Sequence, residues 1–365
     1  MNNTDLKHLI QKQKSNFSLD QEFYINQHIF DLDIKNIFSK QWVFVGHVSR
    51  IPNYGDYFLF NIGKESIIII RDKDSSVHAH YNVCRHRGSH ICLENEGNTK
   101  ALICPYHAWT YNLDGSLRGA RLMEKGFDKN QWHLHECNVK IFEGLIFINL
   151  SEKPNSFEEF ISPTKKFIEF HGLADAKIAH RQYYPTHGNW KLTLDNFHEC
   201  YHCHPSHPEY CQVHDKEYII AYGAGSNTGP ASDKFDKVLS EWNEKVKKMG
   251  HLTGEYSETE FNDYSRSAER TPLKEGMFTE TKSGQPISKL MGKFKDYDCG
   301  YTSVGTSPFN SLLMCNDFAT LFTFIPVSPL YTQVELMWLV HKDAEEGKDY
   351  NLDEMKWMWD VTTIA

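Results

Sequence analysis

The pattern of hydrophobic and polar positions changes character near residue 42. Residues 1–40 are mostly polar and contain stretches with helical spacing of their apolar positions. Short runs rich in β-branched and aromatic residues follow, at 57–60, 66–70 and 77–83, and turn residues separate them. This part of the chain is therefore predicted to form short β-strands.

Two hairpins are predicted in the same region. An Asp-Gly pair lies in the middle of 110–117, and a Glu-Gly pair lies between the apolar runs of 139–150. Such pairs favour the tight turns that join antiparallel strands. Residues 42–155 are therefore expected to form a small antiparallel β domain.

A helix is predicted to follow Asn189, whose side chain can cap it at Trp190. Steps of three and four residues place Glu199 and His202 on one face of this helix. Pro205 is expected to end the helix, because proline removes a backbone donor.

The last third of the chain mixes helices with long strands. An amphipathic helix is predicted at 235–249, where an apolar stripe precedes a glycine. Long apolar runs at 318–327 and 332–341 predict strands, and 352–363 is predicted to be a helix. The whole pattern indicates an α+β protein.

Composition narrows the class of protein. The chain has 365 residues, a formal net charge of −9, no long basic run and no run of eighteen apolar residues. These features argue against a nucleic-acid partner and against a membrane span. The nine cysteines show no regular disulfide spacing, and the polar start lacks the apolar core of a signal peptide. We therefore expect a cytoplasmic protein with reduced thiols.

The first candidate site consists of two short cysteine–histidine motifs. Cys84 and His86 are separated by one residue, Cys104 and His107 by two, and seventeen residues lie between His86 and Cys104. A Rieske [2Fe–2S] cluster uses two Cys on one iron and two His on the other. A zinc site of Cys2His2 type is the alternative, but zinc fingers place a Cys pair before a His pair. Because each motif offers one ligand of each type, the pattern favours a Rieske cluster.

The second candidate site lies far downstream. Glu199, His202 and His207 resemble the two-His, one-carboxylate ligand set of non-haem Fe(II) centres, in which open positions remain for O2 and substrate. We prefer His202 with His207 as ligands, but His198 with His202, or a pair including His204, is also possible. Glu199 is either an iron ligand or a carboxylate that accepts a hydrogen bond from a ligand His. A His-rich helix end without metal is the remaining alternative.

Aromatic residues near this second site could hold a quaternary ammonium group by cation–π attraction. They are equally consistent with an ordinary hydrophobic core. The candidates for such a cage are Phe197, Tyr201, Phe309, Phe318 and Phe322.

These motifs together resemble the α subunit of the Rieske non-haem iron oxygenase family. The resemblance runs along nearly the whole chain and rests on residues 82–88, 104–111, 189–191 and 199–203. Further segments are similar to the oxygenase component of glycine betaine monooxygenases, whose relatives include choline, carnitine and stachydrine oxygenases. These segments are 206–209, 338–344 and 346–350.

The resemblance implies a fold and an assembly. It implies a Rieske antiparallel β domain, here 42–155, inserted into a catalytic domain made of 1–41 and 156–365. That catalytic domain is expected to have an antiparallel sheet covered by helices, of helix-grip type. The resemblance also implies a homotrimer, in which Glu199 bridges His107 of one subunit and His202 of the next.

The implied function is that of a terminal oxygenase in a two-component system. A separate NAD(P)H-dependent reductase of flavin or ferredoxin type is expected to supply electrons. The implied substrate is a small quaternary ammonium compound similar to glycine betaine, demethylated with release of formaldehyde. The alternatives are an aromatic-ring-hydroxylating dioxygenase and a Rieske electron carrier whose second iron site is non-functional.

The third iron ligand is not evident in the sequence. In the family this ligand is an Asp that lies about where this chain stops, so we expect it beyond residue 365 and expect the catalytic domain to be truncated. Asp360 is the fallback candidate, one helical turn too early.

Overall fold

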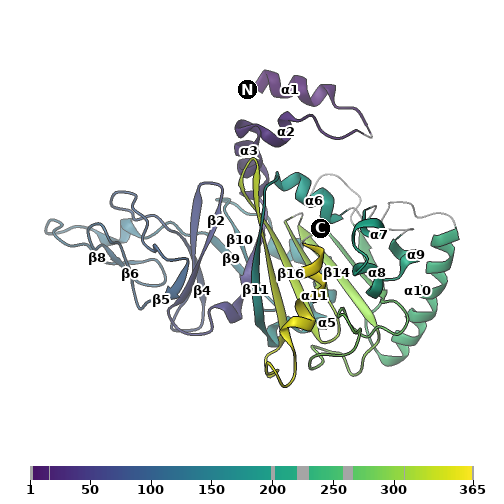
Figure 1. Ribbon diagram of the computed structural model, residues 1–365. Helices are drawn as coiled ribbons and strands as arrows, with labels where there is room; N and C mark the ends of the chain where they lie inside the picture. The colour runs from purple at the N-terminus through teal and green to yellow at the C-terminus, as the bar shows by residue number, and fades with distance from the viewer. Residues whose placement is uncertain are drawn as a thin grey trace. The chain divides into compact units, whose positions relative to one another are not determined.

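The computed structural model describes residues 3–15, 17–198, 202–219, 230–257, 266–307 and 309–363. The chain forms two compact units. The smaller unit consists of residues 31–157, and the larger unit joins 1–30 to 158–365. Figure 1 shows both units as ribbons. The smaller unit is thus an insertion in the sequence of the larger one.

The smaller unit is built from three antiparallel sheets. One has the strand order β4 (Val77–Tyr81), β3 (Glu65–Arg71), β2 (Asp56–Ile62) and β5 (Glu96–Asn98). A second has the order β1 (Val43–His47), β10 (Leu145–Asn149) and β9 (Asn138–Phe142). The third has the order β6 (Leu102–Ile103), β7 (Thr110–Tyr111) and β8 (Leu117–Gly119). Short helical turns occupy Ile34–Phe38, Val48–Arg50 and Lys129–Trp132.

Both predicted hairpins are present. Tyr111 pairs with Leu117 across the first, and Gly115 in its turn has a φ of 84°. In the second, Glu143 and Gly144 have φ values of 48° and 76° between the paired strands β9 and β10. Two successive residues of positive φ match the right-handed twist of the flanking strands.

The larger unit contains one antiparallel sheet of seven strands. Its order is β11 (Ala176–Thr186), β17 (Tyr331–His341), β16 (Phe318–Ser328), β15 (Asn310–Met314), β14 (Gly300–Ser307), β13 (Ser267–Pro272) and β12 (Glu255–Ser257). Nearly all residues of β15, β16 and β17 are buried. The two long strands predicted from apolar runs therefore lie in the middle of this sheet, where both of their faces are covered.

Helices flank this sheet. The N-terminal helices are α1 (Asn3–Lys12), α2 (Glu22–Ile25) and α3 (Gln27–Asp33), and α4 (Phe157–Ile161) and α5 (Lys165–His171) precede β11. A 3-10 turn at Leu173–Asp175 follows α5. Then come α6 (Trp190–His198), α7 (Cys203–Ser206), α8 (Tyr210–Val213), α9 (Lys216–Tyr218), α10 (Pro230–Met249) and α11 (Leu352–Thr362). Among them, α6 packs on β16 and β17, α5 on β14 and α10 on β13.

The two helices predicted at the C-terminal side are present, and Gly250 follows α10 with a φ of 76°, as expected. The Asn351 side chain, which was not predicted as a cap, accepts hydrogen bonds from the first amides of α11. Within the described ranges, no helix combines the length and the apolar character that crossing a bilayer requires.

The prediction of one helix from Trp190 through His202 is only partly correct. The Asn189 side chain accepts a 3.0 Å hydrogen bond from the Lys191 amide, as an N-cap should. However, α6 is described only to His198, and His202 immediately precedes the short helix α7, which begins at Cys203. Pro205 lies inside α7 and does not terminate it. Proline is tolerated there because first-turn amides have no helical acceptor.

Candidate metal centres

The two predicted cluster loops have the same backbone conformation. In each loop the amide of the Cys donates to the carbonyl five residues later, at 2.8 Å for Cys84 and 2.9 Å for Cys104. Each Cys carbonyl accepts from the amide four residues later, at 3.0 Å from both Gly88 and Ala108. Those two residues have φ values of 75° and 55°. Positive φ is uncommon for alanine, so the turn is imposed by the loop's hydrogen bonds.

These loops bring the four predicted ligands together, with the two Cys side chains buried and the two His side chains nearer the surface. Cys84 and Cys104 are each only 2% exposed and belong to the unit's hydrophobic core. The ring centroids of His86 and His107 lie 4.6 Å apart, and the His107 side chain is exposed. The donor set thus has two buried thiols and two imidazoles near the surface. It fits a Rieske cluster, in which sulfur and nitrogen ligands belong to different irons.

Tyr111 is a further participant that the sequence did not single out. Its hydroxyl accepts a 3.1 Å hydrogen bond from the Arg85 amide and lies 3.3 Å from the Cys84 sulfur, so it is placed to donate to that sulfur once the thiol is deprotonated. Burial raises the pKa of Cys84, and this hydroxyl opposes that increase. A donor to a ligand sulfur stabilises the more negative state and raises a cluster's reduction potential. The signal was available, because Tyr111 lies only four residues after His107.

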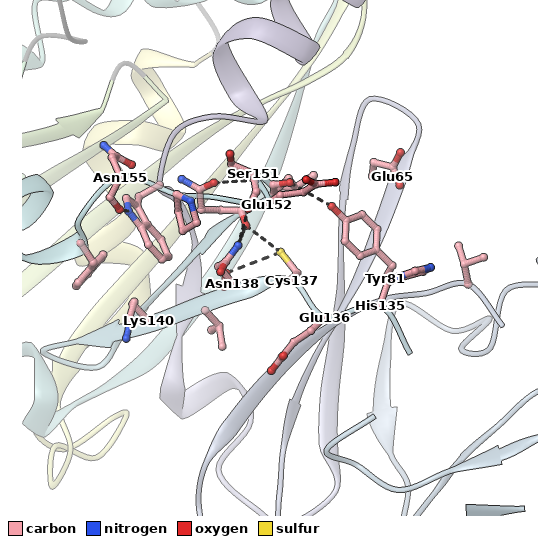
Figure 2. Close-up of a pocket in the computed structure, with 17 residues that line it drawn as sticks. Glu65, Tyr81, His135, Glu136, Cys137, Asn138, Lys140, Ser151, Glu152 and Asn155 are labelled. Atoms are coloured by element: carbon pink, nitrogen blue, oxygen red, sulfur yellow. Dashed lines mark hydrogen bonds between the residues drawn. The ribbon is translucent and has the colours of Figure 1, made fainter. Parts of the chain in front are cut away.

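The smaller unit also has a cavity that is separate from these loops. Figure 2 shows this space of about 830 Å³, which includes Glu65, Tyr81, Cys137 and Lys140 in its lining. The Cys137 thiol contacts the carbonyls of Asn138 and Asn149 there, at 3.8 and 3.6 Å. None of the four predicted cluster ligands lines this cavity.

In the larger unit, His202 and His207 meet across the short helix α7. Their ring centroids lie 5.2 Å apart with the planes at 79°. Both line two cavities of about 440 and 730 Å³, so both are accessible to a small molecule. His198 lines only the smaller of these cavities, and the exposed His204 lines neither. The geometry therefore favours His202 with His207 among the pairs considered.

Glu209 fixes the orientation of His207. This carboxylate is 5% exposed, its Oε1 lies 3.2 Å from His207 Nδ1, and it accepts a 2.9 Å hydrogen bond from Thr362 on α11. Because Nδ1 is held by Glu209, Nε2 is the His207 nitrogen left for a metal ion. A carboxylate behind a ligand His is the arrangement found at many metal centres. Glu209 belongs to the segment 206–209 that carries part of the family resemblance, but its sequence context indicated no role for it.

The other residues predicted to take part in the second site are Glu199, Tyr201 and Asp360. Glu199 and Tyr201 lie outside the described residues, so the role of Glu199 stays a prediction. Asp360 accepts a 3.1 Å hydrogen bond from the Tyr184 hydroxyl and forms a 3.3 Å ion pair with Lys356. It does not line either cavity that contains the two histidines.

The described residues contain no set of three His, Cys, Asp or Glu side chains that could hold one metal ion. For the first site this is expected, since each iron of a Rieske cluster takes two protein ligands. For the second site, His202 and His207 supply two of the three donors that a facial triad needs.

The predicted aromatic cage is only partly assembled around these histidines. Phe197 lines both cavities and Phe322 lines the larger one. Phe309 and Phe318 are each 1% exposed and line neither cavity. They belong to the core, where most aromatic residues of a sheet are found.

The smaller cavity contains an acidic residue that sequence reasoning missed. Glu269 on β13 accepts a 2.7 Å hydrogen bond from the Tyr218 hydroxyl on α9. Burial raises the pKa of Glu269, and the Tyr218 hydrogen bond opposes that increase. No pattern in the sequence distinguishes this glutamate, because the strand that carries it is short and polar.

Known families match both units. The profile described as Ring hydroxylating alpha subunit (catalytic domain) matches residues 173–364, and that of the Rieske [2Fe-2S] domain matches residues 41–142. The glycine betaine monooxygenase oxygenase subunit of Pseudomonas aeruginosa is 35% identical over 357 residues. The match covers 97% of this chain and 81% of that protein.

Solved structures show the same fold. A quaternary ammonium Rieske monooxygenase, studied for carnitine oxidation, matches with a TM-score of 0.67 and 24% identity, over 93% of this chain and 79% of that one. Naphthalene 1,2-dioxygenase from Rhodococcus sp. matches with the same TM-score and 23% identity, and the match covers 98% of this chain and 79% of that one. These likenesses confirm the predicted α+β fold class, with antiparallel sheets in both units.

Proposed function

Since this chain belongs to the Rieske non-haem iron oxygenase family as an oxygenase α subunit, we propose that it demethylates a small quaternary ammonium compound similar to glycine betaine. The observation that carries this proposal is the 35% identity to glycine betaine monooxygenase over 97% of the chain. The fold alone does not distinguish this substrate from an aromatic one, because naphthalene dioxygenase matches equally well.

The proposed reaction balances as a monooxygenation. The substrate methyl group, O2, two electrons and two protons give an N-hydroxymethyl compound and water. That compound then breaks its carbon–nitrogen bond, which leaves the electron pair on nitrogen and releases formaldehyde and a proton. An NAD(P)H-dependent reductase of flavin or ferredoxin type is the proposed electron donor.

Different residues of the chain are assigned to the two metal centres. We assign Cys84, His86, Cys104 and His107, in the proposed domain 42–155, to the cluster, and His202 and His207, in the proposed catalytic domain 1–41 and 156–365, to the iron. When bound, the cluster supplies single electrons and the Fe(II) activates O2. With the Cys84 sulfur deprotonated by the cluster, the Tyr111 hydroxyl 3.3 Å away would donate to it, and Glu209 would accept from His207 Nδ1–H at 3.2 Å.

The direct test is a substrate assay with reductase present. Glycine betaine is expected to release one formaldehyde per NAD(P)H oxidised, and naphthalene is expected to give no product. Formaldehyde is measured by a colorimetric trap and the demethylated amine by mass spectrometry. Turnover of naphthalene with betaine inert would replace this proposal by that of a ring-hydroxylating dioxygenase.

Glu199 is proposed to link two subunits of a homotrimer, between His107 of one and His202 of the next. A Glu199→Gln variant is therefore expected to retain both metal centres but to reoxidise its cluster about 100-fold more slowly, since a carboxylate that joins two ligand histidines is lost. Stopped-flow absorbance with substrate and O2 measures this rate. An unchanged rate would remove Glu199 from the electron path, and sedimentation would show whether the trimer forms.

A further inference from the structure

The smaller cavity beside the two candidate iron ligands has an unusual charge distribution. Its described lining includes one carboxylate, Glu269, and neither a lysine nor an arginine. Asp and Glu are seldom left in such a place without a cationic partner, because removing a charge from water is costly. Among the residues that the structure describes, the side chain that hydrogen-bonds to Glu269 is the neutral hydroxyl of Tyr218.

The floor of this cavity is one face of the sheet. Glu269 and Ser267 are alternate residues of β13, and Ser303 and Gly305 are alternate residues of β14. Alternate residues of a strand point to the same face. Glu269 pairs directly with Ser303, and Ser267 pairs directly with Gly305. Because three of these four side chains are small, they leave space above the sheet in which Glu269 is the longest side chain.

Aromatic side chains form walls around that space. Phe197, Tyr210, Tyr218 and Tyr301 all line the cavity. Tyr218 is held in place by packing on Phe235, with ring centroids 5.1 Å apart. Aromatic faces attract a quaternary ammonium group, and a carboxylate adds direct charge attraction. A cavity of about 440 Å³ is ample for such a small ligand.

We infer that Glu269 is the specificity-determining residue that selects a cationic head group in this cavity, so that the substrate's quaternary nitrogen lies next to its carboxylate. This inference rests on the proposed function and extends it by naming the residue that recognises the positive charge of the substrate. A neutral compound of the same shape would leave the half-buried Glu269 carboxylate without a compensating charge, and the cavity discriminates against it.

The test compares choline with dimethylbutanol, its neutral analogue in which carbon replaces the quaternary nitrogen. Calorimetry on the iron-loaded protein measures both affinities without any turnover. The unmodified protein is expected to bind choline at least about tenfold more tightly than the analogue, because only the cation meets a compensating charge. In Glu269→Gln, which keeps a hydrogen-bond acceptor for Tyr218, that preference is expected to fall to about twofold or less.

Two matched variants separate charge from structure. Glu269→Asp keeps the charge and is expected to keep the preference. Glu255→Gln removes the exposed carboxylate that faces Glu269 directly across the β12–β13 pair. It is expected to change the preference much less than Glu269→Gln does, because Glu255 does not line the cavity and water screens most of its charge. If Glu269→Gln fails to fold, Ser303→Lys places an ammonium opposite Glu269 and should abolish the preference instead.

The binding test of Glu269 and the formaldehyde assay of the proposed function can fail independently. Equal binding of choline and dimethylbutanol by the unmodified protein, or an undiminished preference in Glu269→Gln, would overturn the inference. Failure of glycine betaine to yield formaldehyde would overturn the substrate proposal and leave the choline preference to be judged by its own measurement.

Discussion

Replacing Cys84 by serine is expected to produce a colourless protein that lacks the [2Fe–2S] cluster and has no measurable oxygenase activity. Cys84 is buried, and its sulfur lies 3.3 Å from the Tyr111 hydroxyl. A serine hydroxyl is a poor ligand for iron, and no other described thiol shares the conformation of the two cluster loops. Visible absorption and the EPR signal of the reduced protein measure cluster content.

Cys92→Ser is the matched control for this prediction. Cys92 is also buried and belongs to the same hydrophobic core as Cys84 and Cys104, but it lies outside both ligand loops. It is expected to lose a little stability and keep the cluster in full. If Cys84→Ser retained the reduced-state EPR signal, or if both variants lost it equally, the cluster ligands would have to be reassigned.

His207→Ala is expected to abolish binding of mononuclear iron while the cluster remains intact. His207 and His202 are the two imidazoles that line both cavities, and Glu209 holds His207 with Nε2 free. Loss of a carboxylate behind a ligand His alone typically lowers metal affinity by about 10- to 100-fold. We therefore expect Glu209→Gln to lower the affinity for Fe(II) by about 10- to 100-fold. His207→Ala is expected to lower it by more than that. Calorimetric titration of the cluster-loaded protein with Fe(II) under nitrogen gives both values.

His198→Ala is the control that distinguishes the alternative ligand pair. His198 precedes His202 by four residues and was a candidate on helical spacing, but it lines only the smaller cavity. Its variant is expected to bind Fe(II) as tightly as the unmodified protein. Weakened binding in His198→Ala with normal binding in His207→Ala would make His198 the ligand. If the unmodified protein bound no Fe(II) beyond the two irons of the cluster, the electron-carrier alternative with a non-functional second site would be supported instead.

The sequence predicted most of the local structure around both centres. The hairpins at 110–117 and 139–150, the cap at Asn189 and the helix α11 all depend on residues close together in the chain. Turn types and caps are set by such local hydrogen bonds and by backbone preferences. For this reason the patterns were reliable there, and the helix predicted from Trp190 is described as far as His198.

The residues that surround the ligands were not predictable in the same way. Glu209 meets Thr362 from the far end of the chain, and Tyr218 meets Glu269 fifty-one residues later. Each pair is joined by a single hydrogen bond whose partners share no spacing rule. Neither contact leaves a periodic signal, because it depends on how a helix packs on the sheet.

The sequence by itself indicated two candidate metal-binding motifs and predicted the α+β class that the comparisons confirm. It did so because ligand chemistry and hydrophobic periodicity are properties of neighbouring residues. Only the tertiary structure decided which histidine pair is brought together, that Asp360 is bonded to Tyr184 and Lys356, and that Glu269 lines the cavity beside His202. Those facts depend on long-range packing, which sets the direction of a side chain in space and so decides its chemistry.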